Sequence, residues 1–258
     1  MEKFNFKKKY GQNFIQNEDI LNRIVESFDL DNEDIILEIG PGAGALTKKL
    51  IKFGNDVVAF EIDETLKEYL KGISTSNLKV IFKDFLEVNL RDYFGDSDKI
   101  NVIANIPYYI TTPIITKFIK ENFIPKCMVL MVQKEVALRL CAKPKSSDYG
   151  AISVILNYFF DLDYLFTVSK EDFYPVPNID SAIIKLNKKS ANINLKSYEK
   201  FEKLVFDAFK QKRKNLRNNL KSYDLKKIEE ILSKYSLNLT NRAEDLDYII
   251  FVEISNII

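Results

Sequence analysis

Short apolar runs alternate with segments of helical periodicity through the first two thirds of the chain. The runs are rich in β-branched residues and short enough to be buried strands. Regular alternation of strands and helices is typical of a mainly parallel sheet that is covered by helices on both faces. The pattern therefore predicts an α/β, doubly wound fold, whose first five strands are Ile35–Ile39, Val57–Phe60, Leu78–Phe82, Ile100–Ala104 and Cys127–Val132.

Two helix starts can be placed between and before these strands. Asn17 is a favourable N-cap for a helix that runs from Glu18 to Phe28. Thr112 and Pro113 favour a second start, with Thr112 as the N-cap and Pro113 as the first helical residue. The first helix would present one apolar stripe, formed by Ile20, Leu21, Ile24, Val25 and Phe28.

The pattern changes after Leu186. Three more strands are predicted before this point, at Ile152–Phe160, Tyr164–Val168 and Ser181–Leu186. A polar stretch follows, and the remaining apolar residues recur at helical spacing in Tyr198–Phe209, Leu225–Tyr235 and Asp247–Ile257. We therefore expect a boundary near Lys188, with one domain over residues 1–187 and a smaller all-α domain over residues 188–258.

Composition excludes several kinds of site. The chain has 258 residues, 46% of them hydrophobic, and it contains no histidine. Zinc centres and His-based triads are therefore largely excluded. Cys127 and Cys141 are too far apart for a C-x-x-C pair and are expected to be structural. No window approaches about 18 uncharged apolar residues, and the N-terminus lacks an apolar signal core. We expect a soluble cytoplasmic protein with no metal and no membrane partner.

Positive charge is concentrated in one stretch, although the net charge is only +1. Between Lys185 and Lys221, twelve Lys or Arg residues stand against three acids, a surplus of nine that leaves the rest of the chain acidic. Such a basic zone is an electrostatic footprint for phosphate, with a solvated Lys-rich helix face as the alternative. Five residues in this zone are the candidates for contacts with nucleic-acid phosphates: Lys210, Lys212, Arg213, Lys214 and Arg217.

Glycines crowd the turn after the first predicted strand. The segment Glu38-Ile39-Gly40-Pro41-Gly42-Ala43-Gly44 has the spacing G-x-G-x-G rather than G-x-G-x-x-G. Its glycines permit a tight turn and a close approach of a ligand to the backbone. The altered spacing suits a phosphate-free nucleoside better than a pyrophosphate. Gly40 and Gly42 are thus candidate cofactor contacts, although the loop on its own is also compatible with an ordinary strand-to-helix turn.

The next three strands each end in a side chain that suits such a ligand. Glu61, about 20 residues past the loop, is placed to bind two ribose hydroxyls. Its alternatives are that Asp63 does so, or that Glu61 is an acid at a helix N-terminus. Asp84 can accept a hydrogen bond from an adenine amine while Phe85 packs beside the ring, and Asn105 ends the fourth strand. The cofactor that fits this crevice is S-adenosylmethionine, which has a ribose, an adenine and a cationic sulfonium but no phosphate.

The segment Asn105-Ile106-Pro107-Tyr108 suits a planar amine. The Asn105 side-chain oxygen can accept a hydrogen bond, Pro107 fixes its own backbone and so holds the neighbouring carbonyls, and Tyr108 offers a ring for stacking. Hydrogen bonds to Asn105 and to a carbonyl of Ile106 or Pro107 would pull the amine toward tetrahedral geometry and free its lone pair. The motif therefore suggests methylation of an exocyclic base nitrogen without a strong general base.

With these motifs the chain resembles the KsgA-type small-subunit rRNA adenine dimethyltransferases nearly from end to end. The family-like segments, besides the glycine loop and the Asn105 motif, are Lys8–Ile15, Gln133–Val136, Tyr149–Gly150, Phe173–Pro177, Asp180–Ala182, Arg213–Leu220 and Arg242–Leu246. Ile106 and Tyr10 stand where the family commonly has Leu, and both keep an apolar group.

The resemblance implies a Rossmann-like methyltransferase fold that uses S-adenosylmethionine. It implies dimethylation of the N6 amine of adenines, two adjacent ones, in the 16S rRNA of the small ribosomal subunit during ribosome biogenesis, by a monomer. Two other functions remain open. One is a large-subunit rRNA adenine methyltransferase that confers antibiotic resistance, and the other is a ribosome-assembly factor for which methylation is incidental.

The resemblance also implies further site residues. Asn13 and Ile15 would close over the cofactor, and the target base would stack between Tyr108 and an aromatic residue of the Phe173–Pro177 segment. In a chain with 19 Phe residues, Phe173 on its own would be assigned to the core. The prolines of the Phe173–Pro177 segment favour instead a stiff, irregular loop that displays this ring.

Overall fold

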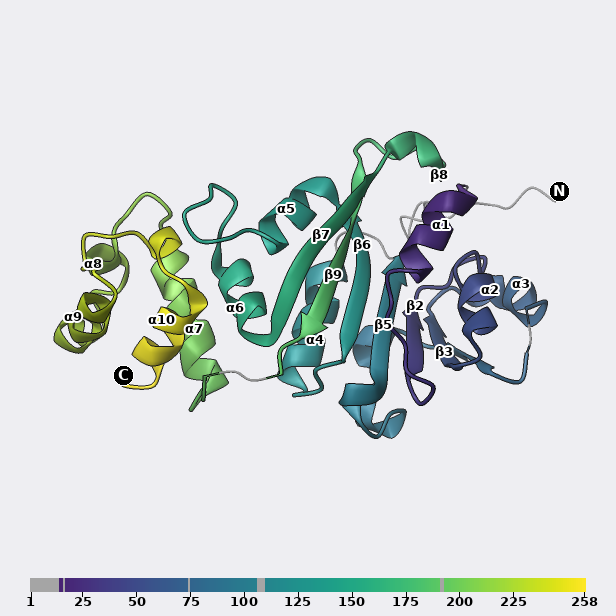
Figure 1. Ribbon diagram of the computed structural model, residues 1–258, viewed down its shortest axis with the longest axis horizontal. Coiled ribbons are helices and arrows are strands. Elements are labelled where there is room, and N and C mark those ends of the chain that lie inside the picture. The colour runs from purple at the N-terminus through teal and green to yellow at the C-terminus, as the bar shows by residue number, and fades with distance from the viewer. Residues whose placement is uncertain (1–13, 16, 74, 106–109, 191–192) are drawn as a thin grey trace. The chain divides into compact units, whose positions relative to one another are not determined.

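The computed structural model describes residues 14–15, 17–73, 75–105, 110–190 and 193–258 (Figure 1). The chain forms two compact units. One comprises the chain up to Ala137 together with Asp163–Lys188, and the other comprises Leu138–Leu162 together with Lys189–Ile258. The division after Lys188 lies where the sequence pattern changes. Residues 138–162, however, pack with the helical unit, which differs from the predicted division into residues 1–187 and 188–258.

One sheet dominates the first unit. Its strand order is β4-β3-β2-β5-β6-β9-β7. The five strands from β4 to β6 are parallel, and β9 is antiparallel to β6. The strands are β2 (Ile35–Ile39), β3 (Asp56–Glu61), β4 (Leu78–Phe82), β5 (Ile100–Asn105), β6 (Cys127–Gln133), β7 (Phe160–Val168) and β9 (Ser181–Lys188). The predicted doubly wound α/β fold is therefore confirmed.

Helix α1 (Glu18–Val25) covers one face of the sheet and begins as predicted. Asn17 Oδ1 accepts hydrogen bonds from the backbone N–H groups of Asp19 and Ile20 at 3.0 and 3.4 Å. The helix ends at Val25 rather than at Phe28. Its buried stripe packs with Ile36 of β2, Ile103 of β5 and further strand residues, together with Leu46 and Leu50 from the start and end of α2 (Thr47–Leu50).

The opposite face of the sheet is covered by α4 (Thr111–Lys120) and an aromatic cluster. The ring of Phe85 lies 5.5 Å from that of Phe60 on β3 and 5.7 Å from that of Phe118 on α4. Helix α4 begins at Thr111, one residue before the predicted cap, so that Pro113 is its third residue. Helix α3 (Lys67–Lys71) adds a smaller apolar cluster through Leu70.

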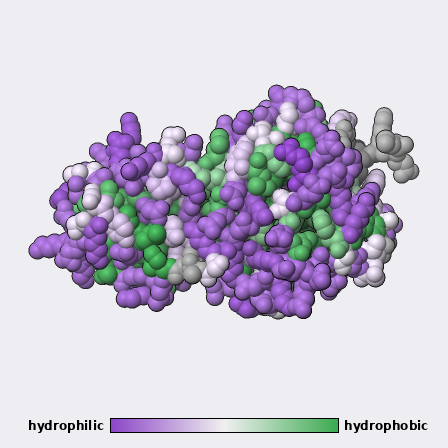
Figure 2. Space-filling model, viewed as in Figure 1, coloured by the Kyte–Doolittle hydropathy of each residue, from purple (hydrophilic) through white to green (hydrophobic). Residues whose placement is uncertain are grey.

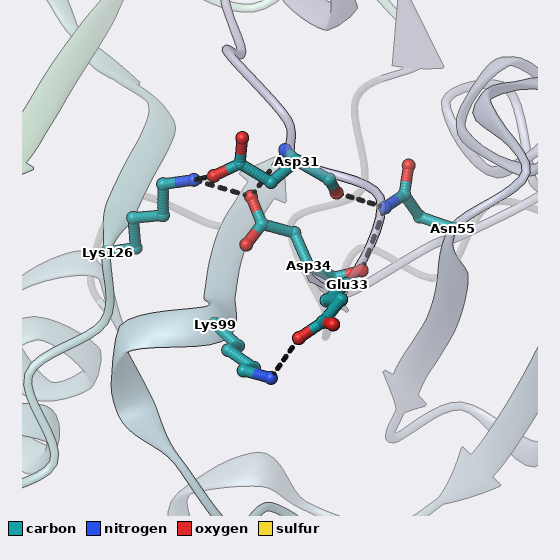
Figure 3. Close-up of polar contacts among 6 residues, drawn as sticks. All are labelled: Asp31, Glu33, Asp34, Asn55, Lys99 and Lys126. Carbon is teal, nitrogen blue, oxygen red and sulfur yellow. Dashed lines mark hydrogen bonds and ion pairs between the residues drawn. The ribbon is translucent and has the colours of Figure 1, made fainter.

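A network of charged and polar groups holds the amino edge of the sheet (Figure 3). Its members are Asp31, Glu33, Asp34, Asn55, Lys99 and Lys126. Lys126 Nζ contacts Asp31 Oδ2 at 2.6 Å and Asp34 Oδ2 at 2.8 Å. Asn55 Nδ2 donates to the carbonyl oxygens of Asp31 and Asp34 at 2.8 and 2.9 Å. The loop before β2 is thus tied to the starts of β3 and β6, at the end of the sheet remote from the predicted site.

A short two-stranded ribbon joins the N-terminal segment to the segment before β9. β1 (Phe14–Ile15) pairs antiparallel with β8 (Phe173–Tyr174), and Ile15 lies opposite Phe173. Asn17 Nδ2 also donates to Asp172 Oδ1 at 2.9 Å. Two segments that were predicted to contribute to the site are therefore held side by side.

The second unit is helical. Its helices are α6 (Ala151–Phe159), α7 (Tyr198–Phe209), α8 (Leu216–Asn219), α9 (Leu225–Lys234) and α10 (Tyr248–Ser255), and α5 (Lys134–Leu140) spans the division between the units. The predicted strand at Ile152–Phe160 is wrong, because this segment forms α6. Helix α6 contacts α7 and α10, so it is buried on several sides and lacks the polar face that would have marked it as a helix.

Figure 2 shows hydrophilic residues over most of the visible face of each unit. Among the described residues, no helix combines the length and the apolar character that a membrane crossing requires.

Candidate active site

Three predicted site residues form one row at the carboxyl edge of the sheet. The strand register pairs Ile39 with Phe60 of β3 and with Ala104 of β5. The next residue on each strand is Gly40, Glu61 or Asn105, so these three follow one another across the sheet. The order of the strands reverses between β2 and β5, and ligands of doubly wound sheets bind at such a switch point.

The glycine loop adopts a backbone that other residues rarely adopt. Gly40, Gly42 and Gly44 have φ angles of 73°, 58° and 81°. Gly40 N–H donates to the carbonyl of Phe60 at 2.9 Å, and Gly44 N–H donates to the carbonyl of Pro41 at 2.9 Å. A Cβ atom on Gly44 would lie 2.1 Å from Ile73 Cδ1. The glycines are therefore required by the turn itself, and they leave its backbone open to a ligand.

Gly44→Ala is expected to lower the free energy of unfolding by about 2 kcal/mol, because it combines a left-handed backbone with a clash. Gly54→Ala is the matched control, since Gly54 has a φ of 86° but no atom within 4 Å of the added carbon. The control should lose about 1 kcal/mol from backbone strain alone. Urea unfolding of both variants measures the difference, and equal losses would contradict the contact with Ile73.

Glu61 is anchored to the glycine loop. Its side chain is buried at the end of β3. Oε2 accepts a hydrogen bond from the backbone N–H of Gly42 at 3.0 Å, and Oε1 accepts one from the backbone N–H of Asp63 at 2.8 Å. Burial raises the pKa of the Glu61 carboxyl, while these backbone N–H groups act in the opposite direction. Both oxygens are thus held in fixed directions beside the loop.

Asp63 and Asp84 each act as a cap. Asp63 Oδ1 accepts hydrogen bonds from the backbone N–H and the hydroxyl of Thr65 at 3.1 and 2.6 Å. Asp84 Oδ1 accepts one from the backbone N–H of Leu86 at 2.8 Å, at the start of a 3₁₀ turn. Asp63 therefore stabilises its own turn, whereas Glu61 reaches the glycine loop, and the ribose role of Glu61 stays a prediction. Asp84 is half-buried at the end of the neighbouring strand.

A second buried acid lies beside Glu61 and was not assigned a role from the sequence. Glu38 of β2 accepts a hydrogen bond from the hydroxyl of Thr47 at 2.7 Å through Oε2. Burial raises the pKa of Glu38, the Thr47 hydrogen bond lowers it, and the nearby Glu61 raises it, which together bring this pKa to about 7. In the sequence, the signal for Glu38 was its position just before the G-x-G-x-G loop. Its burial, however, depends on α2 and β3.

This carboxyl makes stability depend on pH. Its pKa in the folded protein lies above the ordinary value of 4.5, so the folded state binds the proton more tightly and stability falls as the pH rises through about 7. From pH 5 to pH 8 the loss should be about 2 kcal/mol. Glu38→Gln keeps an acceptor for Thr47 and should remove this loss. Urea unfolding at both pH values measures it, and an identical pH dependence in the variant would contradict the buried acid.

Two apolar side chains near the acids are exposed. Ile62 directly follows Glu61 and is 48% exposed, and Leu86 lies two residues after Asp84 and is 36% exposed. Because β3 and β4 are neighbours, these side chains follow adjacent strand ends. They offer apolar surface to a flat ring at the positions where an adenine was predicted. Neither residue stands out in the sequence, because an isolated apolar residue is not unusual on a protein surface.

Three predicted site residues have side chains in the core. Ile15 and Phe173 are 4% and 2% exposed and belong to the apolar cluster around α1. Phe85 is 4% exposed within the aromatic cluster. The predicted display of Phe173 on a loop is therefore wrong for this structure, because β8 pairs with β1 and turns the ring inward. The neighbouring Tyr174 is 53% exposed.

The remaining predicted residues divide into two groups. Asn105 is half-buried at the end of β5. Asn13, Pro107 and Tyr108 lie outside the described residues, so their roles stay predictions.

The cysteines and acids give no sign of other chemistry. Cys127 is buried in β6, and burial raises the pKa of its thiol to about 11, which suits a structural residue. Within the part of the chain that the structure describes, no three Cys, Asp or Glu side chains gather as metal ligands would.

The five candidate phosphate-binding residues are all exposed in the helical unit. Four of them lie in the turn after α7, namely Lys210, Lys212, Arg213 and Lys214. Arg217 lies in α8. Asn219 Nδ2 donates to the carbonyl of Ala208 at 2.7 Å, which holds the end of α7. Lys212 Nζ donates to the carbonyl of Ser147. The turn is therefore held by hydrogen bonds to α8 and to Ser147, while its basic residues are exposed.

Comparison with known proteins points to one family. The family model described as ribosomal RNA adenine dimethylase matches residues 3–258. A relative from Fusobacterium nucleatum, named ribosomal RNA small subunit methyltransferase A, is 43% identical over 261 residues, which cover 98% of both chains. A relative of the same name from Mycoplasmopsis pulmonis is 46% identical over 220 residues, which cover 84% of both chains.

Solved structures agree with this match. A dimethyladenosine transferase from Plasmodium falciparum is 28% identical with a TM-score of 0.77, covering 93% of this chain and 95% of the other. The 23S rRNA methyltransferase ErmE is 24% identical with a TM-score of 0.73, covering 94% and 98%, and it shows the shared fold alone. Because the family model and the F. nucleatum relative span nearly the whole chain, the protein belongs to the ribosomal RNA adenine dimethylase family.

Proposed function

We propose that the protein transfers two methyl groups from S-adenosylmethionine to the N6 amine of adenines in the 16S rRNA of the small ribosomal subunit. The observation that carries this proposal is the row of Gly40, Glu61 and Asn105, which sets a neutral amide acceptor beside the glycine loop and a buried carboxylate at the switch point of the sheet. Membership of the family gives the reaction class. The relatives' names supply the subunit.

The residues at this edge of the sheet fit S-adenosylmethionine. The Glu61 oxygens can accept hydrogen bonds from the ribose hydroxyls in addition to those from Gly42 and Asp63, since each carboxylate oxygen has two lone pairs. Asp84 would accept from the adenine amine, and Ile62 and Leu86 would contact the ring. When bound, the cofactor supplies an electrophilic methyl group on a cationic sulfonium. Buried acids near the loop favour a cation over an anion there.

Asn105 would orient the target amine. Its side-chain oxygen accepts a hydrogen bond from the amine, which favours tetrahedral nitrogen and makes the lone pair available for methyl transfer. A neutral acceptor suffices, because the methylated amine is acidic and loses its proton to water. The monomethylated product still carries one N–H, and that N–H can donate to the same oxygen. This acceptor can therefore support a second transfer.

The helical unit would hold the RNA around the target. With seventeen Lys or Arg against twelve Asp or Glu, this unit is basic, while the first unit is acidic. Lys210, Lys212, Arg213, Lys214 and Arg217 would contact backbone phosphates. Extruding a base from a duplex costs roughly a few kcal/mol, so unpaired adenines are the expected targets.

The test is methylation of separate ribosomal subunits. Purified protein, methyl-labelled S-adenosylmethionine and immature small or large subunits should yield label in small-subunit RNA alone, and nucleoside mass spectrometry should identify N6,N6-dimethyladenosine. Label confined to large-subunit RNA would overturn the proposed substrate. Monomethyladenosine as the final product would overturn dimethylation. Binding of small subunits without any label would instead indicate an assembly factor.

A further inference from the structure

The loop between α5 and α6 lies beside the basic turn after α7, within the helical unit (Figure 1). Lys212 Nζ donates to the carbonyl of Ser147 in this loop. The backbone N–H of Lys145 donates to the carbonyl of Glu244 at 2.8 Å. The Lys212 bond thus joins two segments 65 residues apart in the sequence, and the Lys145 bond joins the loop to the segment before α10.

The loop adds two cations to that surface. Lys143 and Lys145 are exposed, as are the basic residues of the turn after α7. Among the acids nearby, Glu244 contacts Arg242 at 3.6 Å, and Asp148 is exposed at the far end of the loop. A charge count along the stretch from Lys185 to Lys221 omits both lysines of the loop. Only the fold brings these two lysines to the basic turn after α7.

Lys145 also has an unfavourable backbone. Its φ is 71°, in the left-handed region that Gly or Asn adopts at lower cost. The other described non-glycine residues with positive φ are Asn122 and Ser236, which are small and polar. The side chain at this position is long, cationic and exposed. Strain of this kind is a reason to look for a function in the side chain.

We propose that Lys143 and Lys145 form a second phosphate-binding segment, which contacts the RNA backbone together with Lys210, Arg213 and Lys214. This inference rests on the proposed function and names further contacts for the same substrate. Two segments joined by a hydrogen bond can bind phosphates that are separated along the RNA but close in space, as they are in a folded RNA. The partner is therefore the sugar-phosphate backbone of structured rRNA, read by shape rather than by base sequence.

The first test is the salt dependence of RNA binding. Lys143→Gln/Lys145→Gln should weaken binding of immature small subunits about tenfold, and should reduce the slope of log K against log salt by about 1.4–1.8 for two lost contacts. The matched control is Lys226→Gln/Lys227→Gln, which removes two exposed lysines from α9 of the same unit. A loop variant that behaves like this control overturns the inference.

The second test separates binding from folding. Lys145→Gly relieves the backbone strain, so its melting temperature should equal or exceed that of the wild type while its RNA affinity falls severalfold. Unchanged RNA affinity would overturn the role of Lys145. Failure of the inference differs from failure of the proposed function. If only the inference fails, the wild type still methylates small subunits and the loop variants bind RNA as the control does. If the proposed function fails, the wild type itself forms no dimethyladenosine.

Discussion

Replacing Asn105 by alanine is expected to lower the rate of methyl transfer about a thousandfold at saturating cofactor and RNA, a loss of about 4 kcal/mol of transition-state stabilisation. The variant loses the side-chain oxygen that accepts the hydrogen bond from the target amine. Without that bond the amine stays planar, and its lone pair remains delocalised into the ring. The measurement is single-turnover formation of methylated adenosine.

Asn101→Ala is the matched control for this variant. Asn101 lies on the same strand, four residues before Asn105, and its buried amide has no hydrogen-bond partner. The control should keep the wild-type rate, since Asn101 lies near the amino edge of the sheet. Asn105→Asp retains an acceptor oxygen and should lose far less activity than Asn105→Ala. If the two alanine variants were equally active, Asn105 would not orient the amine.

Replacing Glu61 by glutamine is expected to weaken binding of S-adenosylmethionine about a hundredfold, or about 2.7 kcal/mol. The carboxylate accepts hydrogen bonds from the backbone N–H groups of Gly42 and Asp63. Glutamine has one oxygen, so its NH₂ group would face one of these donors. It would also leave one ribose hydroxyl without an acceptor. Calorimetric titration with the cofactor measures the change.

Glu64→Gln is the control for Glu61, because it makes the same chemical change at an exposed position three residues away. It should bind the cofactor as the wild type does. Melting temperatures of both variants report whether either change disturbs the fold. Wild-type affinity in a folded Glu61→Gln protein would exclude Glu61 as the ribose ligand.

Local chemistry was sufficient to predict much of the first unit. The strands β2 and β4 have the predicted bounds, because short β-branched runs between turns have few other solutions. Asn17 caps α1 because a short side-chain oxygen at that position reaches the first free N–H groups of the helix. The glycines of the loop have positive φ, which is a property of those residues themselves. Parallel strands then necessarily bring Gly40, Glu61 and Asn105 to one edge.

Other features depend on which elements pack together. The segment Ala151–Phe159 is apolar on nearly every side, so its sequence does not separate a buried strand from a buried helix. Contacts with α7 and α10 decide for the helix. Phe173 is turned inward by pairing with Ile15, a contact between residues far apart in the chain.

The sequence by itself thus determined most strands of the sheet, the cap of α1, the glycine turn and the family. Tertiary structure decided the burial of Glu38, the inward position of Phe173 and the union of the Lys145 loop with the helical unit. The physical reason is that dihedral preferences and hydrogen-bond caps act within a few residues, whereas burial and electrostatic environment are set by neighbours that only folding brings close.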